Sequence, residues 1–338
     1  MAGLARNHRN PAVKPEQSSV SDRHAADRAR QAWRVERQRL EAGLARNRRY
    51  GVAGERAMTP LARLFRNGTV ASVFRLLGLY RRGMRNAEGV RLETATMSFA
   101  NLPQAFDGYS ILHLSDLHIN DSFPAFAHAS RFFRGLEVDL VVMSGDYQTF
   151  GAPDPGTTAA LIAGMLSGLV ARDGLVAVLG NHDSHEMAGA LEGVGFRMLV
   201  NEGMRIQRAE AELILAGTDD VFCFHTDAAA ALLHSFQDGF RIAVVHTPDL
   251  ATTAARAGYS LYLTGHTHGG QVCMPGGRPF MTGLDSHHGL ASGSWEWRGM
   301  LGHTSRGLGS GLVPVRFNCP PEATVIRLRR ASCGQGET

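Results

Sequence analysis

Short apolar runs alternate with longer mixed segments along most of the chain, starting near residue 92. Six runs of six or seven residues are rich in Val, Ile and Leu, as buried strands are: YSILHLS (109–115), DLVVMSG (139–145), LVAVLG (175–180), ELILAG (212–217), FRIAVVH (240–246) and YSLYLTG (259–265). Helical patterns lie between several of them, at 123–135, 157–171, 184–193 and 249–257. This alternation predicts an α/β fold. The segment 313–330 predicts two further strands joined at Pro320-Pro321.

The pattern before residue 92 is helical and only thinly apolar. Residues 21–47 predict one helix, whose narrow apolar stripe consists of Ala29, Trp33, Leu40 and Leu44. In the segment 58–84 the apolar face changes phase after Asn67-Gly68, which predicts two short helices. Their apolar faces are Leu61, Leu64 and Phe65 in the first, and Val70, Val73, Phe74 and Leu77 in the second.

Charge divides the chain at the same place as the hydrophobic pattern. Residues 1–91 contain 20 Lys and Arg against 7 Asp and Glu, a net +13, whereas the remainder contains 15 against 24, a net −9. The basic character of the whole chain therefore belongs to its first part. We predict a polar, disordered tail (1–21), a basic helical extension (22–91), an α/β domain (92–330) and a flexible tail (331–338).

The basic extension has three interpretations. It could bind reversibly to an anionic membrane, bind nucleic acid, or cover the α/β domain. Its apolar residues favour a membrane or packing over contact with a nucleic-acid backbone. The best candidate for a spanning helix, residues 60–82, is interrupted by Arg63, Arg66 and Arg75, and no secretory signal pattern precedes it. We expect a cytoplasmic protein that lies at most peripherally on a membrane.

Polar side chains follow the strands of the α/β domain at the point where each strand ends. Ligands gather at the carboxyl ends of strands in open α/β sheets. Each of these residues alone could be explained as part of a turn, as a helix cap or as a core histidine. Such separate explanations do not account for their common position at one edge of the sheet. We expect no comparable polar cluster at the strand starts. The residues are Asp116, His118, Asp146, Asn181, His182, Asp183, His246, His266 and His268.

These residue types indicate metal binding. His266 and His268 stand two positions apart in GHTH, so on an extended chain both imidazoles would point to one spot. A single zinc ion needs only three or four ligands, whereas seven candidates are present and combine oxygen with nitrogen donors. An aspartate can bridge two ions, which lower the pKa of a water molecule and neutralise phosphoryl oxygens. The pattern therefore predicts a dinuclear centre and phosphoester hydrolysis.

Other enzyme classes lack their required residues. The chain contains one lysine, Lys14 in a polar stretch, which excludes a P-loop or kinase site. No G-x-S-x-G is present, so a serine-hydrolase nucleophile elbow is excluded. The four cysteines are scattered, without a C-x-x-C pair, and indicate neither a zinc knuckle nor a disulfide scaffold.

The chain resembles the calcineurin-like metallophosphoesterases. Five blocks that match the family pattern occur in order: SDLH, SGDYQ, GNHD, VVHTPD and GHTH. GHTHGGQVCMPG, SRGLGSGL (305–312) and PPEATVIRL look like the YkuE/YaeI-type phosphodiesterase branch. The resemblance implies a four-layer αββα sandwich preceded here by the helical extension, and identifies 92–330 as the catalytic domain. GDYQTFG lacks the Asp-Arg-Gly of protein phosphatases, which disfavours phosphoprotein substrates.

The resemblance also implies roles for individual residues. Asp116, His118 and His268 would hold one divalent ion, Asn181, His246 and His266 a second, and Asp146 would bridge the two. The ions would be Mn, Zn or Fe. His182 would donate a proton to the leaving oxygen, with Asp183 orienting it.

The predicted function is that of a dinuclear metal-dependent phosphodiesterase. One alternative is a nucleotide-lipid pyrophosphatase, of the kind that cleaves UDP-diacylglucosamine, at a membrane surface. Another is a nuclease or nucleic-acid-binding module that uses the basic extension. The segment 281–299 is rich in His, Gly and Trp, so His287, His288, Trp295 and Trp297 are candidates for a substrate pocket. The substrate, the metals and the oligomeric state are open.

Overall fold

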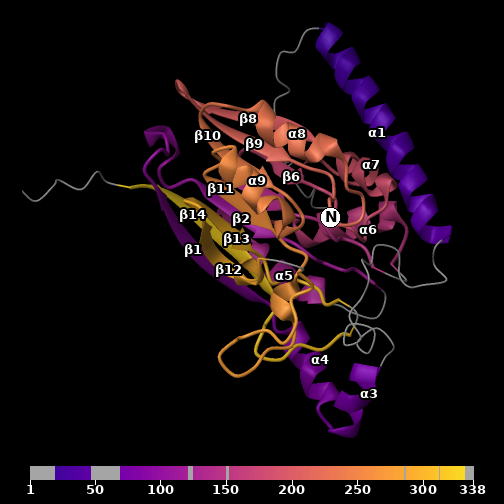
Figure 1. Ribbon diagram of the computed structural model, residues 1–338. Coiled ribbons are helices and arrows are strands. Elements are labelled where there is room, and N and C mark those ends of the chain that lie inside the picture. Colours follow the sequence, from indigo (N-terminus) through magenta and orange to yellow (C-terminus); the bar gives the residue numbers. More distant parts are fainter. Residues whose placement is uncertain are drawn as a thin grey trace, which may run out of the picture.

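Two six-stranded sheets pack face to face in the centre of the protein, with helices on both outer sides (Figure 1). This computed structural model describes residues 20–46, 69–120, 125–149, 152–284, 287–311 and 313–331. The predicted helix at 58–67 and the tails 1–19 and 332–338 lie outside these residues.

The first sheet contains the early strands of the domain and its last strand. Its order is β1 (Arg91–Phe99), β14 (Glu322–Arg330), β2 (Ser110–Leu114), β4 (Leu140–Met143), β6 (Leu175–Ala177) and β7 (Phe196–Met198). Strands β2, β4, β6 and β7 run parallel, and β14 is antiparallel to β2. The parallel run brings the carboxyl ends of β2, β4 and β6 to one edge.

The second sheet has a parallel centre and antiparallel edges. Its order is β12 (Gly293–Trp297), β13 (Met300–Thr304), β11 (Leu261–Thr264), β10 (Phe240–Val244), β9 (Ala211–Gly217) and β8 (Glu202–Arg208). Strands β9, β10, β11 and β13 are parallel, while β8 and β12 are antiparallel to their neighbours. A small pair, β3 (Glu137–Val138) and β5 (Val170–Ala171), lies apart.

Side chains alternate between the two faces of each sheet, which separates the apolar core between the sheets from the apolar clusters on their outer faces. Ile111 and Val142 point into the core between the sheets, while their neighbours Leu112 and Val141 point to the outer face of the first sheet. Three helices cover that outer face: α5 (Ala125–Phe133), α6 (Pro155–Met165) and α7 (His185–Gly193). The second sheet is covered by α8 (Asp227–Ser235) and α9 (Ala251–Arg256). The result is the predicted αββα sandwich, which confirms the fold class.

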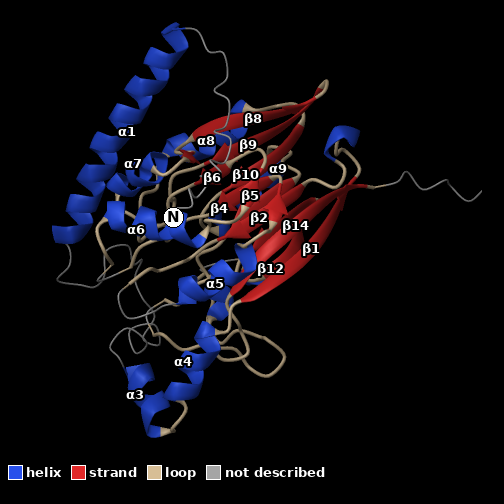
Figure 2. Cartoon of the chain, turned by 180° about the vertical axis from the view of Figure 1, so that it is seen from behind, coloured by secondary structure: helices blue, strands red, loops and turns tan. Residues whose placement is uncertain are grey.

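The N-terminal helices lie at two separate places on the domain. Helix α1 (Val20–Arg46) runs beside α7 along one side of the molecule in both views (Figures 1 and 2). Helices α3 (Thr69–Leu76) and α4 (Tyr80–Glu88) project from the opposite end. The second of the two predicted short helices is thus divided near Gly78, which has φ 67°.

Two expectations about the sheets are wrong. The segment 313–319 forms only an isolated bridge, between Phe317 and Val272, because its residues pack on α3 and α4 in place of a neighbouring strand. The strand starts do carry a polar cluster. There Asp139, before β4, accepts hydrogen bonds from Ser110 and Arg208, and Asp173, before β6, accepts from Arg208 and Tyr109.

Short 3₁₀ turns complete the chain path. They are η2 (Gln104–Phe106), η3 (Pro248–Leu250), η4 (His268–Gly270) and η5 (His288–Leu290). The turn η4 begins four residues after the end of β11 and carries His268, so it forms part of the polar strand edge.

Candidate metal centre

The carboxyl ends of five strands meet at the edge where the two sheets come together. Asp116 and His118 follow β2, Asp146 follows β4, Asn181 follows β6, His246 follows β10, and His266 and His268 follow β11. Asp116, Asp146 and His246 are at most 2% exposed, so the site lies largely in the interior. The structure brings all seven predicted ligand residues together.

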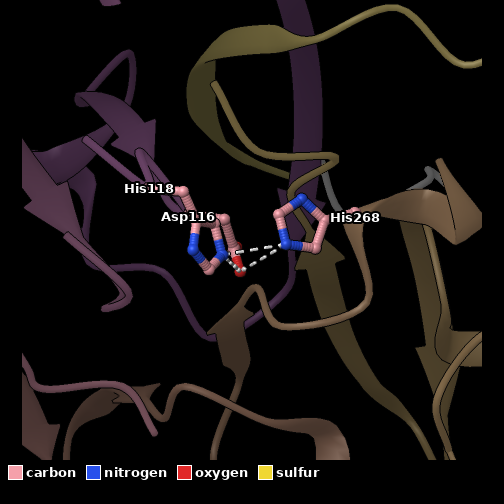
Figure 3. A group of neighbouring side chains, drawn as sticks. All are labelled: Asp116, His118 and His268. Carbon is pink, nitrogen blue, oxygen red and sulfur yellow. Dashed lines mark hydrogen bonds and ion pairs between the residues drawn. The ribbon is translucent and has the colours of Figure 1, made fainter. Parts of the chain in front are cut away.

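Three of the seven form one compact group, shown in Figure 3. Asp116, His118 and His268 point toward one another, and their nearest ligand atoms all lie within 4.8 Å. The Nε2 atoms of His118 and His268 are 3.0 Å apart, and Asp116 Oδ1 is 3.9 Å and 3.6 Å from them.

A second group lies beside the first. Asp146, His246 and His266 also place ligand atoms within 4.8 Å of one another. The Asn181 side-chain oxygen joins this group, at 3.1 Å from His246 Nε2 and 2.9 Å from His266 Nδ1.

Asp146 lies between the two groups. Its Oδ2 atom is 3.5 Å from His118 Nε2 in the first group and 3.3 Å from His246 Nε2 in the second. Its Oδ1 atom accepts the backbone N–H of His182 at 2.9 Å. One carboxylate oxygen therefore faces ligands of both groups.

The backbone at this edge is strained. Five of the seven residues have left-handed φ angles: Asp116 50°, His118 44°, Asp146 58°, His266 70° and His268 51°. Non-glycine residues rarely adopt this conformation, and it concentrates at functional sites. The expectation that His266 and His268 project to one point from an extended chain is wrong, because the turn sends their rings to different groups.

The electrostatics favour bound cations. Burial lowers the pKa of His118 and of His266 to about 3 each, and that of His268 well below its usual value, so these rings are neutral. Burial raises the pKa of Asp116 to about 6. Among the described residues, Asp116 and Asp146 form ion pairs only with histidines. The chain itself places some positive charge here, on the buried Arg316 guanidinium, whose Nη2 lies 3.3 Å from His268 Nδ1, and on the His246 ring, while the other imidazoles stay neutral and free to act as ligands.

His246 shows most directly where a cation belongs. Its Nδ1–H donates to the backbone oxygen of Ser144 at 2.7 Å, which leaves Nε2 facing Asp146 and Asn181. Burial opposes protonation of this ring, but the Asp146 carboxylate raises the pKa of His246 to about 10. The negative potential that attracts a proton to Nε2 also attracts a metal ion, and an N–H to carbonyl bond on the far side is typical of metal-binding histidines.

The spacing of the ligand atoms fits divalent ions. Donors about 2.0–2.3 Å from a zinc-like ion lie roughly 3–4 Å from one another. The observed separations of 2.9–3.9 Å fall in this range. Imidazole nitrogen combined with carboxylate and amide oxygen is a donor set for borderline transition metals such as Zn, Mn or Fe.

His182 and Asp183 occupy the loop that carries Asn181. The half-buried His182 ring packs edge-on against His118, with ring centroids 5.1 Å apart. Asp183 uses both carboxylate oxygens on backbone N–H groups, those of Asp146, Tyr147, Gln148 and Gly180, at 2.8–3.1 Å. Asp183 therefore joins the loops after β4 and β6, and its implied role in orienting the His182 ring stays a prediction.

The candidate substrate residues lie on and just before β12: Trp295 and Trp297 belong to the strand, whereas His287 and His288 lie at the start of the turn η5 that precedes it. Trp295 Nε1 donates to Thr304 at 2.8 Å, and its ring belongs to the outer apolar cluster. His287 Nε2 is 3.2 Å from the Thr252 hydroxyl, and its ring packs on Trp297. His288 contacts Thr282. These contacts do not include the seven ligands, and substrate binding by these residues stays a prediction.

Sequence reasoning missed residues that flank the second group. Asp219 and Asp220 follow β9 at the same edge and are at most 2% exposed. Phe222 packs on His266, with ring centroids 4.4 Å apart. The strand-end rule, applied to the run 212–217, would have found the two aspartates. No local signal identified Arg37 of α1, which is 1% exposed and bonds to Asp219.

Comparison with known proteins agrees with this geometry. Residues 109–270 match the profile of the Calcineurin-like phosphoesterase family. The chain is 30% identical over 233 residues to Phosphodiesterase YaeI of Escherichia coli, covering 65% of this chain and 82% of that protein. It is 29% identical over 244 residues to the uncharacterized metallophosphoesterase YkuE of Bacillus subtilis, covering 69% and 84%. A second Bacillus subtilis relative, the uncharacterized metallophosphoesterase YkoQ, is 26% identical over 260 residues, covering 71% and 91%.

The chain belongs to the calcineurin-like phosphoesterase family. It is a metal-dependent phosphoester hydrolase, which confirms the enzyme class predicted from the five sequence blocks. In the part of the chain that the structure describes, no helix has the length and apolar character needed to cross a membrane.

Proposed function

We propose that this protein is a phosphodiesterase with a dinuclear metal centre. The position of Asp146 is the observation that carries the proposal. A single oxygen of this carboxylate lies within 3.5 Å of ligand nitrogens from both groups, as a bridging ligand requires. Two divalent ions at this edge would supply an activated water and neutralise the charge of the phosphoryl group.

The chain's own residues divide the remaining work. Asp116, His118 and His268 would hold one ion, Asn181, His246 and His266 would hold the other, and Asp146 would contact both. His182 projects beside the first group with its ring half-buried, where a leaving oxygen can receive its proton. Asp183 keeps the loops of Asp146 and His182 at a fixed separation.

The proposal is tested with two substrates and metal analysis on one preparation. We expect hydrolysis of bis-(p-nitrophenyl) phosphate to exceed that of p-nitrophenyl phosphate, and close to two transition-metal ions per chain. Preference for the monoester would contradict diesterase specificity. Full activity with one ion per chain would contradict the dinuclear centre.

A second candidate function places the enzyme on an anionic membrane. One face of α3 and α4 packs on the domain through Phe74, which stacks on Phe317 at 5.0 Å. The other face exposes Val73, Leu76 and Leu77, with exposed fractions of 46%, 87% and 64%. The same two helices carry four exposed arginines, Arg75 in α3 and Arg81, Arg82 and Arg85 in α4. Apolar side chains beside arginines suit an interface with anionic lipid.

This surface supports a nucleotide-lipid pyrophosphatase as the alternative to a soluble-diester enzyme. We expect the protein to sediment with phosphatidylserine vesicles at low salt, and the variant Leu76→Ser/Leu77→Ser to lose most of that binding while keeping its rate on soluble diesters. Arg39→Ala on α1, where the side chain is 79% exposed, is the charge control. Binding of DNA without binding of vesicles would favour the nucleic-acid interpretation.

A further inference from the structure

Arg37 is buried although it lies on a helix outside the catalytic domain. Helix α1 is mostly exposed along its described length, yet the Arg37 side chain is 0% exposed. Arginine is almost never fully buried without partners, so its contacts indicate a specific role. It meets the domain beside the loops that follow β6 and β9.

The guanidinium group of Arg37 binds both loops at once. Its Nη2 donates to the backbone oxygens of Asp183 at 2.9 Å and Gly180 at 3.2 Å. Its Nη1 donates to Asp219 Oδ1 at 2.5 Å, and its plane lies over the Phe224 ring at 3.3 Å from the centroid. A planar fork can satisfy several acceptors in fixed directions, which a single ammonium group cannot.

The two carbonyl oxygens bracket the catalytic part of the first loop. Asn181 and His182 lie between Gly180 and Asp183. On its inner side this loop is pressed against Asp146, because a Cβ at Gly180 would lie 2.2 Å from Asp146 Oδ1. Arg37 holds the same four residues from the outer side, so the loop is fixed between α1 and the bridging carboxylate.

Neighbouring side chains of α1 strengthen this connection. Trp33 Nε1 donates to Asp219 Oδ2 at 2.7 Å, so Asp219 is bound by two residues of the helix. Glu41 accepts the backbone N–H of His185 at 2.7 Å and contacts the His185 ring at 2.7 Å. The second loop also contains Asp220, which accepts the backbone N–H of Phe222. The Phe222 ring in turn packs on the ring of His266.

We propose that Arg37 is a positioning residue for the active site, which sets the place of Asn181 and His182 through the carbonyl groups on either side of them. Helix α1 then contributes to the geometry of the active site. The inference rests on the proposed function for its kinetic test, whereas its metal-binding test does not depend on the substrate.

The test compares three variants of the full chain. Arg37→Lys keeps the charge opposite Asp219 but cannot reach both carbonyl oxygens. Asp219→Asn keeps the contacts of Arg37 with the carbonyl oxygens and weakens the ion pair. Arg39→Ala is the matched control on the exposed face of α1. For Arg37→Lys we expect kcat on bis-(p-nitrophenyl) phosphate to fall by about 10- to 100-fold with little change in KM, because small misplacements of catalytic groups have effects of this size. For Arg39→Ala we expect kcat within about 3-fold of the unmodified chain, and for Asp219→Asn a clearly smaller fall than for Arg37→Lys, because the contacts to the two carbonyl oxygens are kept.

Metal retention gives an independent measurement. After dialysis, Arg37→Lys should lose the ion held with Asn181 before the other ion, whereas Asp219→Asn should keep both. If kcat and metal content follow the loss of thermal stability equally in Arg37→Lys and Asp219→Asn, Arg37 only neutralises Asp219 and the proposal fails. An unmodified chain without diesterase activity would overturn the proposed function, while the order of metal loss would still decide the role of Arg37.

Discussion

The two ends of the same parallel strands carry similar residues with different counter-charges. At the amino ends of β4 and β6, Asp139 and Asp173 both accept from Arg208, at 2.8 and 3.0 Å. At the carboxyl ends, Asp116 and Asp146 face imidazoles. Both ends carry polar clusters. The two clusters differ in the residue that faces the carboxylates, which is arginine at the amino ends and histidine at the carboxyl ends.

This difference shows how a metal site can be distinguished from a structural polar cluster. A guanidinium is always charged, so the amino-end cluster is neutralised by the chain itself. Burial keeps the pKa of His118 and His266 low, and these neutral rings offer lone pairs without positive charge. The carboxyl-end cluster therefore offers neutral nitrogen ligands beside buried carboxylates, as a metal site does, and backbone strain at five of its residues agrees with a functional role.

Removing the carboxylate between the two groups should have the largest effect. In Asp146→Asn we expect loss of both ions and a fall in activity beyond the roughly 100- to 1,000-fold typical for one lost transition-state contact. Metal analysis and diesterase rates on the same sample measure this. The matched control is Asp238→Asn, an exposed residue, which should keep both ions. An Asp146→Asn protein with full metal content would contradict the bridging role.

His182 should affect turnover without affecting the metals. In His182→Ala we expect about a 100-fold lower kcat, the usual scale for a lost general acid, with unchanged metal content. The loss should be smaller for substrates with acidic leaving groups, because these need less protonation. His234→Ala, at an exposed position at the end of α8, is the control. Equal losses for all leaving groups would assign His182 another role.

Asp183 sharpens the comparison because it lies at the carboxyl end but behaves as a structural carboxylate. Each of its oxygens accepts two backbone N–H groups, and an amide keeps only one accepting oxygen. We expect Asp183→Asn to lower kcat by about 10- to 100-fold, the range for residues that support metal ligands. Glu186→Gln, an exposed neighbour on α7, should be silent. Kinetics of Asp183→Asn indistinguishable from those of Glu186→Gln would show that the loops hold without it.

The fold and the ligand cluster were predictable because their signals are local. Each apolar run and the polar residues after it lie within a few positions, so β2 with Asp116 or β11 with His266 can be read directly from the chain. The left-handed backbone of those residues was not predictable, since aspartate and histidine adopt it more often than most residues but still only at a minority of positions. Nor was the close approach of the loops predictable: a Cβ at Gly265 would lie 2.3 Å from Asp116 Oδ2.

Contacts between distant segments were the main omission. Arg37 and Asp219 are 182 positions apart, and Arg208 and Asp139 are 69 apart. Nothing in the composition of α1 separates the buried Arg37 from the exposed Arg39, because only the position of the helix on the domain does so. For the same reason the extension as a whole was interpreted by its charge, whereas α1 contributes a specific buried contact.

The smallest effect should come from the amino-end cluster, and it should be an effect on stability alone. Burial opposes ionisation of Asp139, but hydrogen bonds from Arg208 and Ser110 lower the pKa of this carboxyl below its ordinary value. Asp139→Asn should therefore lower the free energy of unfolding by about 1–3 kcal/mol near pH 7, with activity and metal content unchanged.

Because the folded-state pKa of Asp139 is depressed, the ionic stabilisation is complete above the unfolded pKa of about 4 and disappears as the pH falls through the folded value. Urea unfolding at pH 7 and at pH 3 should thus show a smaller difference between the two proteins at pH 3. Glu137→Gln, whose side chain is 63% exposed, should show almost no difference at either pH. Loss of metal from Asp139→Asn would mean that the two ends of the strands are coupled, and the separation of a structural end from a functional end would fail.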